Sequence, residues 1–200
     1  MNEGSIAPGY LEAFNAIQGA LIKKSNETLT PELINNIPYA SGKLSIGRGA
    51  EGLVILESKK NLRETWVSAD GVYVVTSGGR IVQTIGLENN LSEIFSSYSA
   101  LDYYNYDSLD FFAYYSFSNP KLDNLKIKVS VKNIGYKTLD LFDGKKKLLV
   151  IEEILENKKL GWKEKNLFFF DEEGSIIKSI QHISPRLPKI YFEVTKKPAR

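Results

Sequence analysis

The chain has 200 residues and a mass of 22.5 kDa, a length that fits one domain, because single hydrophobic cores grow to roughly 250 residues before chains divide. Hydrophobic residues make up 42% and charged residues 25%, which is typical of a globular fold and unlike a disordered chain. The net charge of +2 gives no reason to expect nucleic acid as a partner. The absence of cysteine and the single histidine exclude thiolate catalysis, disulfides and a His/Cys zinc site built within this chain.

Residues 1–40 predict a helical segment. Over residues 10–24, apolar side chains recur at helical spacing and two lysines close the last turn, which indicates an amphipathic helix. A second, short helix is predicted from Thr30, whose hydroxyl accepts a backbone N–H, with Pro31 at the first helical position and an end before Pro38. We expect the first helix to plug an open end or cover an edge of the following sheet.

Residues 41–200 predict an antiparallel sheet, because the apolar period changes to two and turn signals recur. Asp70-Gly71 and Gly78-Gly79 are typical hairpin turns, since type I′ turns need positive φ at both central residues. Residues 88–95 resemble one polar helical turn, and residues 98–107 are predicted to be a loop. The predicted strands are 43–46, 53–59, 63–68, 72–76, 80–85, 109–118, 125–133, 137–142, 148–155, 163–170, 175–183 and 190–195.

About a dozen strands are more than an open twisted sheet holds without curling or splitting. The sequence therefore predicts a mainly all-β fold, in which an antiparallel meander closes into a barrel or half-barrel and carries an N-terminal amphipathic helix. We expect one domain over residues 1–200, with a helical part over 1–40 and the barrel over 41–200.

The patterns associated with catalysis are weak. The lone His182 lies in a predicted strand, where we expect it at the surface or the sheet margin, and the serines lack a Gly-x-Ser-x-Gly elbow. Residues 47–52 read GxGxxG, but a strand follows them, whereas phosphate binding needs a helix N-terminus at that point. A glycoside hydrolase needs two carboxylates roughly 5–10 Å apart, which the spacing of Asp102, Asp107 and Asp110 does not establish. We expect no enzymatic activity, no cofactor and no metal.

The most unusual segment is 98–117, which holds nine aromatic residues. Tyr103, Tyr104 and Tyr106 beside Asp107 suit a sugar ligand, because aromatic faces pack on sugar C–H groups and a carboxylate binds hydroxyls. The alternative is that this segment fills a core and that its tyrosines cover the rim, where amphipathic rings are common. Both interpretations stay open from the sequence.

Three stretches resemble the YjbF/GfcB family of bacterial lipoproteins. Residues 65–87, TWVSADGVYVVTSGGRIVQTIGL, are similar to its W-x-S-x-(D/N)-x…T-x-x-G-R-(L/I)-x-x-T core. Residues 166–181 resemble its N-x-(F/Y)-(W/F)-x-D…G-x-(V/I)-x-x-S-x-Q pattern, and residues 188–198 resemble its P-(I/V)…K-P tail. With a shorter match at residues 37–41, the resemblance spans 37–198 in the family's order, although residues 95–160 match little.

The resemblance implies a protein of group 4 capsule or exopolysaccharide systems, held by a lipid anchor at the periplasmic face of the outer membrane. The lipobox and its cysteine are absent from these 200 residues, so the implied anchor is not present in this chain. The family offers no catalytic residues to carry over. The implied partners are polysaccharide or polysaccharide-export proteins of the cell envelope, and not nucleic acid.

We therefore expect a non-enzymatic accessory or binding factor. One alternative is a barrel that carries a lipid or glycan, for which an internal cavity of several hundred Å³ would be the sign; another is a glycan hydrolase with paired acids. Arg80 begins a strand after a Gly-Gly turn, where its guanidinium is expected to bind carbonyls or a carboxylate of the neighbouring strand. The candidate ligand-binding residues are Trp66, Arg80, Tyr103, Tyr104, Tyr106 and Asp107.

Overall fold

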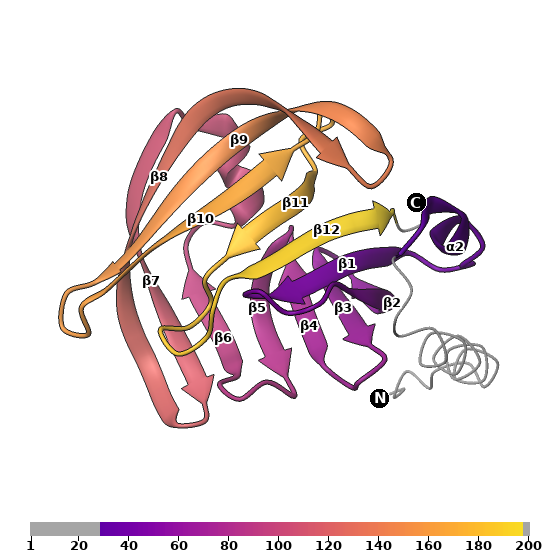
Figure 1. Ribbon diagram of the computed structural model, residues 1–200. Helices are drawn as coiled ribbons and strands as arrows, with labels where there is room; N and C mark the ends of the chain where they lie inside the picture. The colour runs from indigo at the N-terminus through magenta and orange to yellow at the C-terminus, as the bar shows by residue number, and fades with distance from the viewer. Residues whose placement is uncertain (1–28, 198–200) are drawn as a thin grey trace.

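The computed structural model describes residues 29–197, so the helix expected over residues 10–24 lies outside the described residues. The described chain forms twelve strands joined in one antiparallel sheet (Figure 1). The strands are β1 Ser41–Ile46, β2 Gly52–Lys60, β3 Arg63–Ser68, β4 Tyr73–Ser77, β5 Arg80–Ile85, β6 Leu91–Ser96, β7 Ser108–Ser118, β8 Lys121–Leu141, β9 Gly144–Asn157, β10 Trp162–Phe170, β11 Ile176–Gln181 and β12 Ile190–Lys196.

The sheet curls into a nearly closed barrel. Its order is β5-β4-β3-β2-β1-β12-β11-β10-β9-β8-β7-β6, so β1 and β12 pair in the middle and the edges are β5 and β6. These two edges lie beside each other, and the Leu91 N–H donates to Thr84 Oγ1 over 3.0 Å between them. The predicted antiparallel barrel is confirmed.

The inside of the barrel is a packed core rather than an open space. Inward-facing side chains from the strands of both halves of the sheet form one apolar cluster. Trp66 and Phe168 are fully buried in it, and the Trp66 ring meets Phe192 edge-on, with 5.2 Å between centroids. The Trp66 indole N–H donates to Thr76 Oγ1 over 3.1 Å, as a buried polar group requires.

The short helix α2, Pro31–Asn35, covers part of the outside of the barrel. The Leu33 N–H donates to Thr30 Oγ1 over 3.3 Å, which confirms the predicted cap and helix. Ile34 packs with Ile37 against outward-facing residues of β2. Within residues 29–197, no helix is both long and apolar enough to span a bilayer.

Strands β8 and β9 extend beyond the barrel and fold over its outer face (Figure 1). The two strands predicted at 125–133 and 137–142 are one strand, interrupted by an irregularity between Asn133 and Tyr136. Gly135 there has a φ of 86°, and its N–H donates to Asn133 Oδ1 over 2.9 Å. Past this bend, Leu141 and its neighbours pack on outward-facing Phe169 and on β11.

Two sequence predictions for residues 88–107 were wrong. Residues 91–96 form strand β6, not a polar helical turn. This strand pairs with β7, and in it Leu91 points into the barrel while Glu93 and Phe95 face solvent. The expected loop contains a 3₁₀ helix, η1, at Ala100–Asn105. Strand β6 buries only one apolar side chain, that of Leu91, and its Phe95 is 70% exposed. The alternation of apolar and polar residues by which strands are recognised is therefore weak in this segment.

Helix η1 closes one end of the barrel. Leu101 lies against the turn before β5, where a Cβ added to Gly78 would be 2.7 Å from its Cγ. Tyr104 packs on Phe170 with 5.6 Å between ring centroids, and Tyr103 points into the core, where it is fully buried. Among the described residues, η1 is the element that plugs this end of the barrel.

Strands β5 and β11, which are not neighbours in the sheet, come into direct contact inside the barrel. A Cβ on Gly79 would lie 2.5 Å from Cβ of Ile176, and the φ of Gly79 is 81°. The Gln181 side chain crosses this gap: its Oε1 accepts the Ile81 N–H, and its Nε2 donates to the Gly79 carbonyl, both over 3.0 Å. Only glycine fits at this contact.

We predict that Gly79→Ala destabilises the protein by about 2–4 kcal/mol, because it adds both backbone strain and overlap with Ile176. Gly71→Ala is the matched control: its φ is also 81°, but no atom lies within 4 Å of the added Cβ, so about 1 kcal/mol is expected. Urea unfolding measures both. Equal losses in the two variants would contradict a close approach of β5 and β11.

Candidate functional site

A charged pair lies at the centre of the barrel. Arg80 enters from β5 and Glu153 from β9, on walls that are not neighbours in the sheet. The Arg80 Nη2 and Glu153 Oε1 atoms form an ion pair, and the two residues are 5% and 0% exposed. An unpaired charge in an apolar interior is very costly, so each of the two charges lowers the free-energy cost of burying the other.

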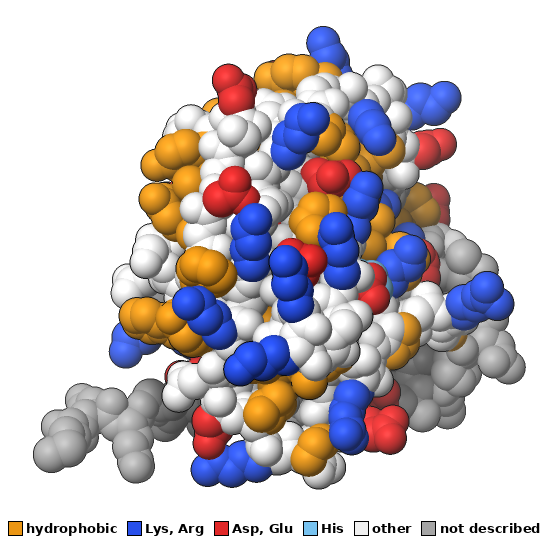
Figure 2. Space-filling view, turned by 90° about the vertical axis from the view of Figure 1, so that its left-hand side faces the viewer, with side chains coloured by type: hydrophobic (Ala, Val, Ile, Leu, Met, Phe, Trp, Pro, Cys, Tyr) orange, Lys and Arg blue, Asp and Glu red, His pale blue; other side chains and the backbone are white. Residues whose placement is uncertain are grey.

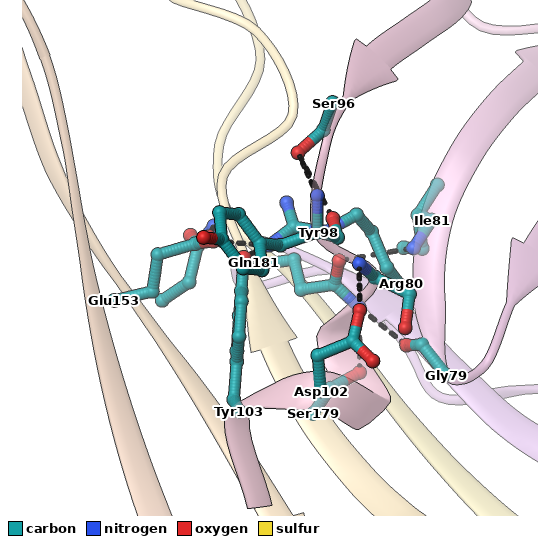
Figure 3. Close-up of polar contacts among 12 residues, drawn as sticks. Gly79, Arg80, Ile81, Ser96, Tyr98, Asp102, Tyr103, Glu153, Ser179 and Gln181 are labelled. Carbon is teal, nitrogen blue, oxygen red and sulfur yellow. Dashed lines mark hydrogen bonds and ion pairs between the residues drawn. The ribbon is translucent and has the colours of Figure 1, made fainter. Parts of the chain in front are cut away.

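Two tyrosines and an asparagine complete the hydrogen bonds of this pair. The Tyr103 hydroxyl donates to Glu153 Oε1 and accepts from Arg80 Nη2, both over 2.7 Å (Figure 3). The Tyr115 hydroxyl accepts from Arg80 Nη1 over 3.1 Å, and Asn166 Nδ2 donates to Glu153 Oε2 over 2.7 Å. We call Arg80, Glu153, Tyr103, Tyr115 and Asn166 the central cluster.

The central cluster joins five elements of the barrel: β5, η1, β7, β9 and β10. Its cation also lies over aromatic faces, with the Arg80 guanidinium carbon 5.3 Å from the Phe168 ring centroid and 5.6 Å from that of Tyr103. Such contacts are strengthened when water is excluded. The side-chain Nε of Arg80 has no hydrogen-bond partner within the described part of the chain.

Arg80, Tyr103 and Tyr115 keep their protons around neutral pH. Burial on its own would lower the pKa of Arg80, but the attraction of the Glu153 carboxylate and the two phenol oxygens raises it above its usual value. Burial raises the pKa of Tyr103 and of Tyr115 well above the usual value for tyrosine. A general acid or base needs a pKa near the working pH, so these three groups are suited to holding the fold and not to proton transfer.

The structure divides the six candidate ligand-binding residues into two groups. Trp66, Arg80 and Tyr103 lie in the interior, where Arg80 and Tyr103 meet in the central cluster. The other three lie at the barrel end, on η1 and directly after it; Tyr104 and Tyr106 are 37% and 39% exposed, and Asp107 is exposed. We call these three the rim residues. Ligand binding by any of the six stays a prediction.

The sequence analysis missed Glu153 and Asn166. Arg80 does bind a carboxylate, but this carboxylate comes from β9 across the barrel and not from the neighbouring strand. The available signal was the alternation of β9, in which residues 149, 151 and 155 are apolar and point into the core while Glu153 occupies the inward position between them. A charge at such a position predicts a buried partner.

The other candidate catalytic groups are engaged in local contacts. Asp102 accepts the Ser99 N–H over 2.6 Å at the start of η1, and Asp110 on β7 accepts from the Ser130 hydroxyl of β8. His182 is half-buried, with Nε2 3.3 Å from a carboxylate oxygen of Glu164, and burial lowers its pKa despite that carboxylate. Over residues 29–197, no group of His, Asp and Glu side chains is placed to hold a metal ion.

Comparison with known proteins decides the family. The family of group 4 capsule polysaccharide lipoproteins described as gfcB, YjbF matches residues 14–194. The chain belongs to the YjbF family. The resemblance found at residues 37–198 is thereby confirmed.

Relatives in Escherichia coli K12 include two proteins named as uncharacterized lipoproteins. GfcB is 28% identical and YjbF 31% identical, each over 83 residues that make up 42% of this chain. The match spans 39% of the length of each of these curated relatives. The crystal structure of the hypothetical lipoprotein YmcC, also from E. coli K12, aligns over 100% of both chains with a TM-score of 0.78 at 19% identity, which shows the shared fold.

We predict that removing one member of the central ion pair costs more than removing both. Arg80→Met or Glu153→Leu alone should lower the free energy of unfolding by about 3–5 kcal/mol, because a buried charge is left without its partner. The double variant should lose less than the sum of the two. Lys59→Met is the control, since its pair with Glu64 is partly exposed and contributes about 0–1 kcal/mol. Additive losses at Arg80 and Glu153 would refute this coupling.

We also predict an alkaline loss of stability that depends on Tyr103. The pKa of Tyr103 is raised in the folded protein. Below about pH 10 the phenol is therefore protonated in both the folded and the unfolded protein, and above that pH it stays protonated only in the folded protein. Stability should therefore fall as pH rises above 10, by up to about 1.4 kcal/mol per pH unit for one such tyrosine. Urea unfolding between pH 9 and 12 should show a shallower fall for Tyr103→Phe than for the unchanged protein. Parallel pH profiles would disprove this role of Tyr103.

Proposed function

We propose that this chain is a non-enzymatic accessory or binding factor for capsule or exopolysaccharide production or export. The observation that carries the proposal is the family match over residues 14–194, which connects the chain to group 4 capsule polysaccharide systems. The proposal assigns it a role through surface contacts with the polymer or with export proteins. Envelope polysaccharide and its export proteins are the proposed partners, and nucleic acid is not.

The packed interior supports a surface role. Bulky side chains fill the barrel, and the polar groups of the central cluster bind one another. A carrier needs a cavity large enough for its cargo, whereas the centre of this barrel is filled by Arg80, Glu153 and the rings around them. The carrier alternative therefore has less support than the accessory role.

The hydrolase alternative also has less support. The names of the relatives describe no enzyme. The carboxylates of Asp102 and Asp110 accept hydrogen bonds from nearby residues, which gives each of them a structural role. Within the accessory role, we propose that the rim residues Tyr104, Tyr106 and Asp107 contact the polymer or a partner, since their exposure leaves them accessible. Trp66, Arg80 and Tyr103 would act indirectly, by holding η1 and the barrel in place.

We further propose that the mature protein is lipid-anchored at the periplasmic face of the outer membrane. The names of its relatives as lipoproteins support the anchor. A tethered factor concentrates its binding surface at the membrane through which the polymer must pass.

The test is genetic and uses the full-length gene. Deletion should lower the amount of polymer at the cell surface and raise the cell-retained amount, and the unchanged gene should restore export. A Tyr104→Ser/Tyr106→Ser/Asp107→Asn variant should restore it poorly, whereas Leu62→Ser, at a more exposed apolar position elsewhere, should restore it fully. Immunoblotting of membrane fractions checks the amount and location of each variant.

Two results would contradict the proposal. Unchanged polymer export in the deletion strain would remove the accessory role. Shortening of purified polymer by the purified protein, abolished by Asp102→Asn, Asp107→Asn and Asp110→Asn together, would establish the hydrolase instead. Polymer length is measured by size-exclusion chromatography.

A further inference from the structure

A groove of about 580 Å³ lies on the outer face of the barrel, at the end of β8 and β9 opposite to their hairpin. Its walls come from β7, from the first part of β8 and from the end of β9 with the turn that follows. The face of the molecule formed by the long strands shows lysine side chains interleaved with apolar ones (Figure 2). The groove is separate from the central cluster and the rim residues.

Two apolar side chains in the groove are exposed to solvent. Phe112 on β7 is 51% exposed and Leu122 on β8 is 40% exposed, and both line the groove. The Lys126 ammonium lies 4.0 Å from the centroid of the Phe112 ring. Exposed apolar groups gathered in a hollow mark a binding surface more often than isolated ones do.

The charge of the groove is predominantly positive. Four lysines line it, against two carboxylates: Lys126, Lys128, Lys158 and Lys159, with Asp123 and Glu156. Lys126 and Lys128 share the outer face of β8, since alternate residues of a strand face the same side. Within residues 29–197, these four lysines make no ion pair, and the only one with a ring contact is Lys126, over Phe112. None of the four charges is therefore neutralised by a carboxylate of the described chain.

The lysines of the two walls are held in a fixed relation by Asn157. Its Nδ2 donates to the Lys126 carbonyl and its Oδ1 accepts the Leu160 N–H, both over 2.9 Å. Asn157 is 8% exposed, so these bonds are largely shielded from water. They tie the turn that carries Lys158 and Lys159 to strand β8, and a site with a fixed shape binds at a lower entropic cost.

We infer that this groove binds a stretch of anionic polysaccharide whose sugars carry carboxylate groups. The lysines would pair with the carboxylates, and the Phe112 ring would pack on the C–H face of a sugar. The volume is in the range that accommodates a short oligosaccharide, and a concave surface suits a single chain better than a flat bilayer. This inference rests on the proposed function, because it names the chemical class of polymer that the accessory factor recognises.

The test measures binding of fluorescently labelled oligogalacturonate to the purified protein by anisotropy. Binding should weaken with added salt, and a neutral malto-oligosaccharide of the same length should not bind. Lys126→Gln/Lys128→Gln should weaken binding by at least about tenfold, because two charge-assisted contacts are removed. Phe112→Ser should weaken it at unchanged charge.

The matched control is Lys137→Gln/Lys145→Gln, which removes the same charge from exposed positions of β8 and β9 outside the groove. It should bind as the unchanged protein does, and circular dichroism checks that each variant is folded. Equal weakening in both double variants would overturn the inference, because net charge would then explain binding. Binding to anionic phospholipid vesicles, lost in the groove variant and without oligogalacturonate binding, would also overturn it in favour of a membrane surface.

This experiment separates the inference from the proposed function. Export that depends on the gene, together with no oligogalacturonate binding, would refute the groove and leave the accessory role. Groove-dependent binding, together with unchanged export after deletion, would confirm the ligand class and refute the accessory role.

Discussion

The fold depends on the pairing of Arg80 with Glu153 inside a barrel that otherwise excludes water. Two opposite charges at the centre of an apolar core are costly unless they pair with each other and the surrounding residues supply further hydrogen bonds. Here β5 and β9 supply the charges, η1 and β7 supply phenol hydroxyls, and β10 supplies an amide. The same constraint fixes the relative position of strands that are far apart in the sheet, so the central cluster specifies how the meander closes.

Apolar side chains are buried on both the inside and the outside of the barrel. Rings such as Trp66 and Phe168 fill the inside, while α2 and the bent hairpin of β8 and β9 cover apolar residues on the outside. The outer surface that stays exposed includes the groove beside Phe112. A packed interior leaves the surface as the place for contacts with other molecules, which is consistent with the proposed accessory role.

Much of the fold could be predicted because each hairpin is encoded locally. The Asp70-Gly71 and Gly78-Gly79 turns fixed the strands on either side of them, and the alternation of β9 and β10 identified both strands. The strand β6 was missed because one buried residue, Leu91, gives too short a pattern. The pairing of Arg80 with Glu153 spans 73 positions and is set by how the barrel closes, so turn chemistry does not encode it. The alternation of β9 places a charge at an inward position and so indicates a buried partner, but it does not say which residue that partner is. Composition singled out the aromatic segment that holds the rim residues, but it did not show that Tyr103 turns inward while Tyr104 and Tyr106 stay exposed.

The attachment of Tyr103 has a consequence for the end of the barrel. Tyr103 belongs to η1, and its hydroxyl bonds both members of the central pair. Lifting η1 away would leave the buried Glu153 carboxylate without one of its hydrogen-bond donors, so these bonds oppose an opening of the barrel at this end. The same bonds help to set where η1 sits, and thereby where the exposed rings of Tyr104 and Tyr106 are presented to solvent.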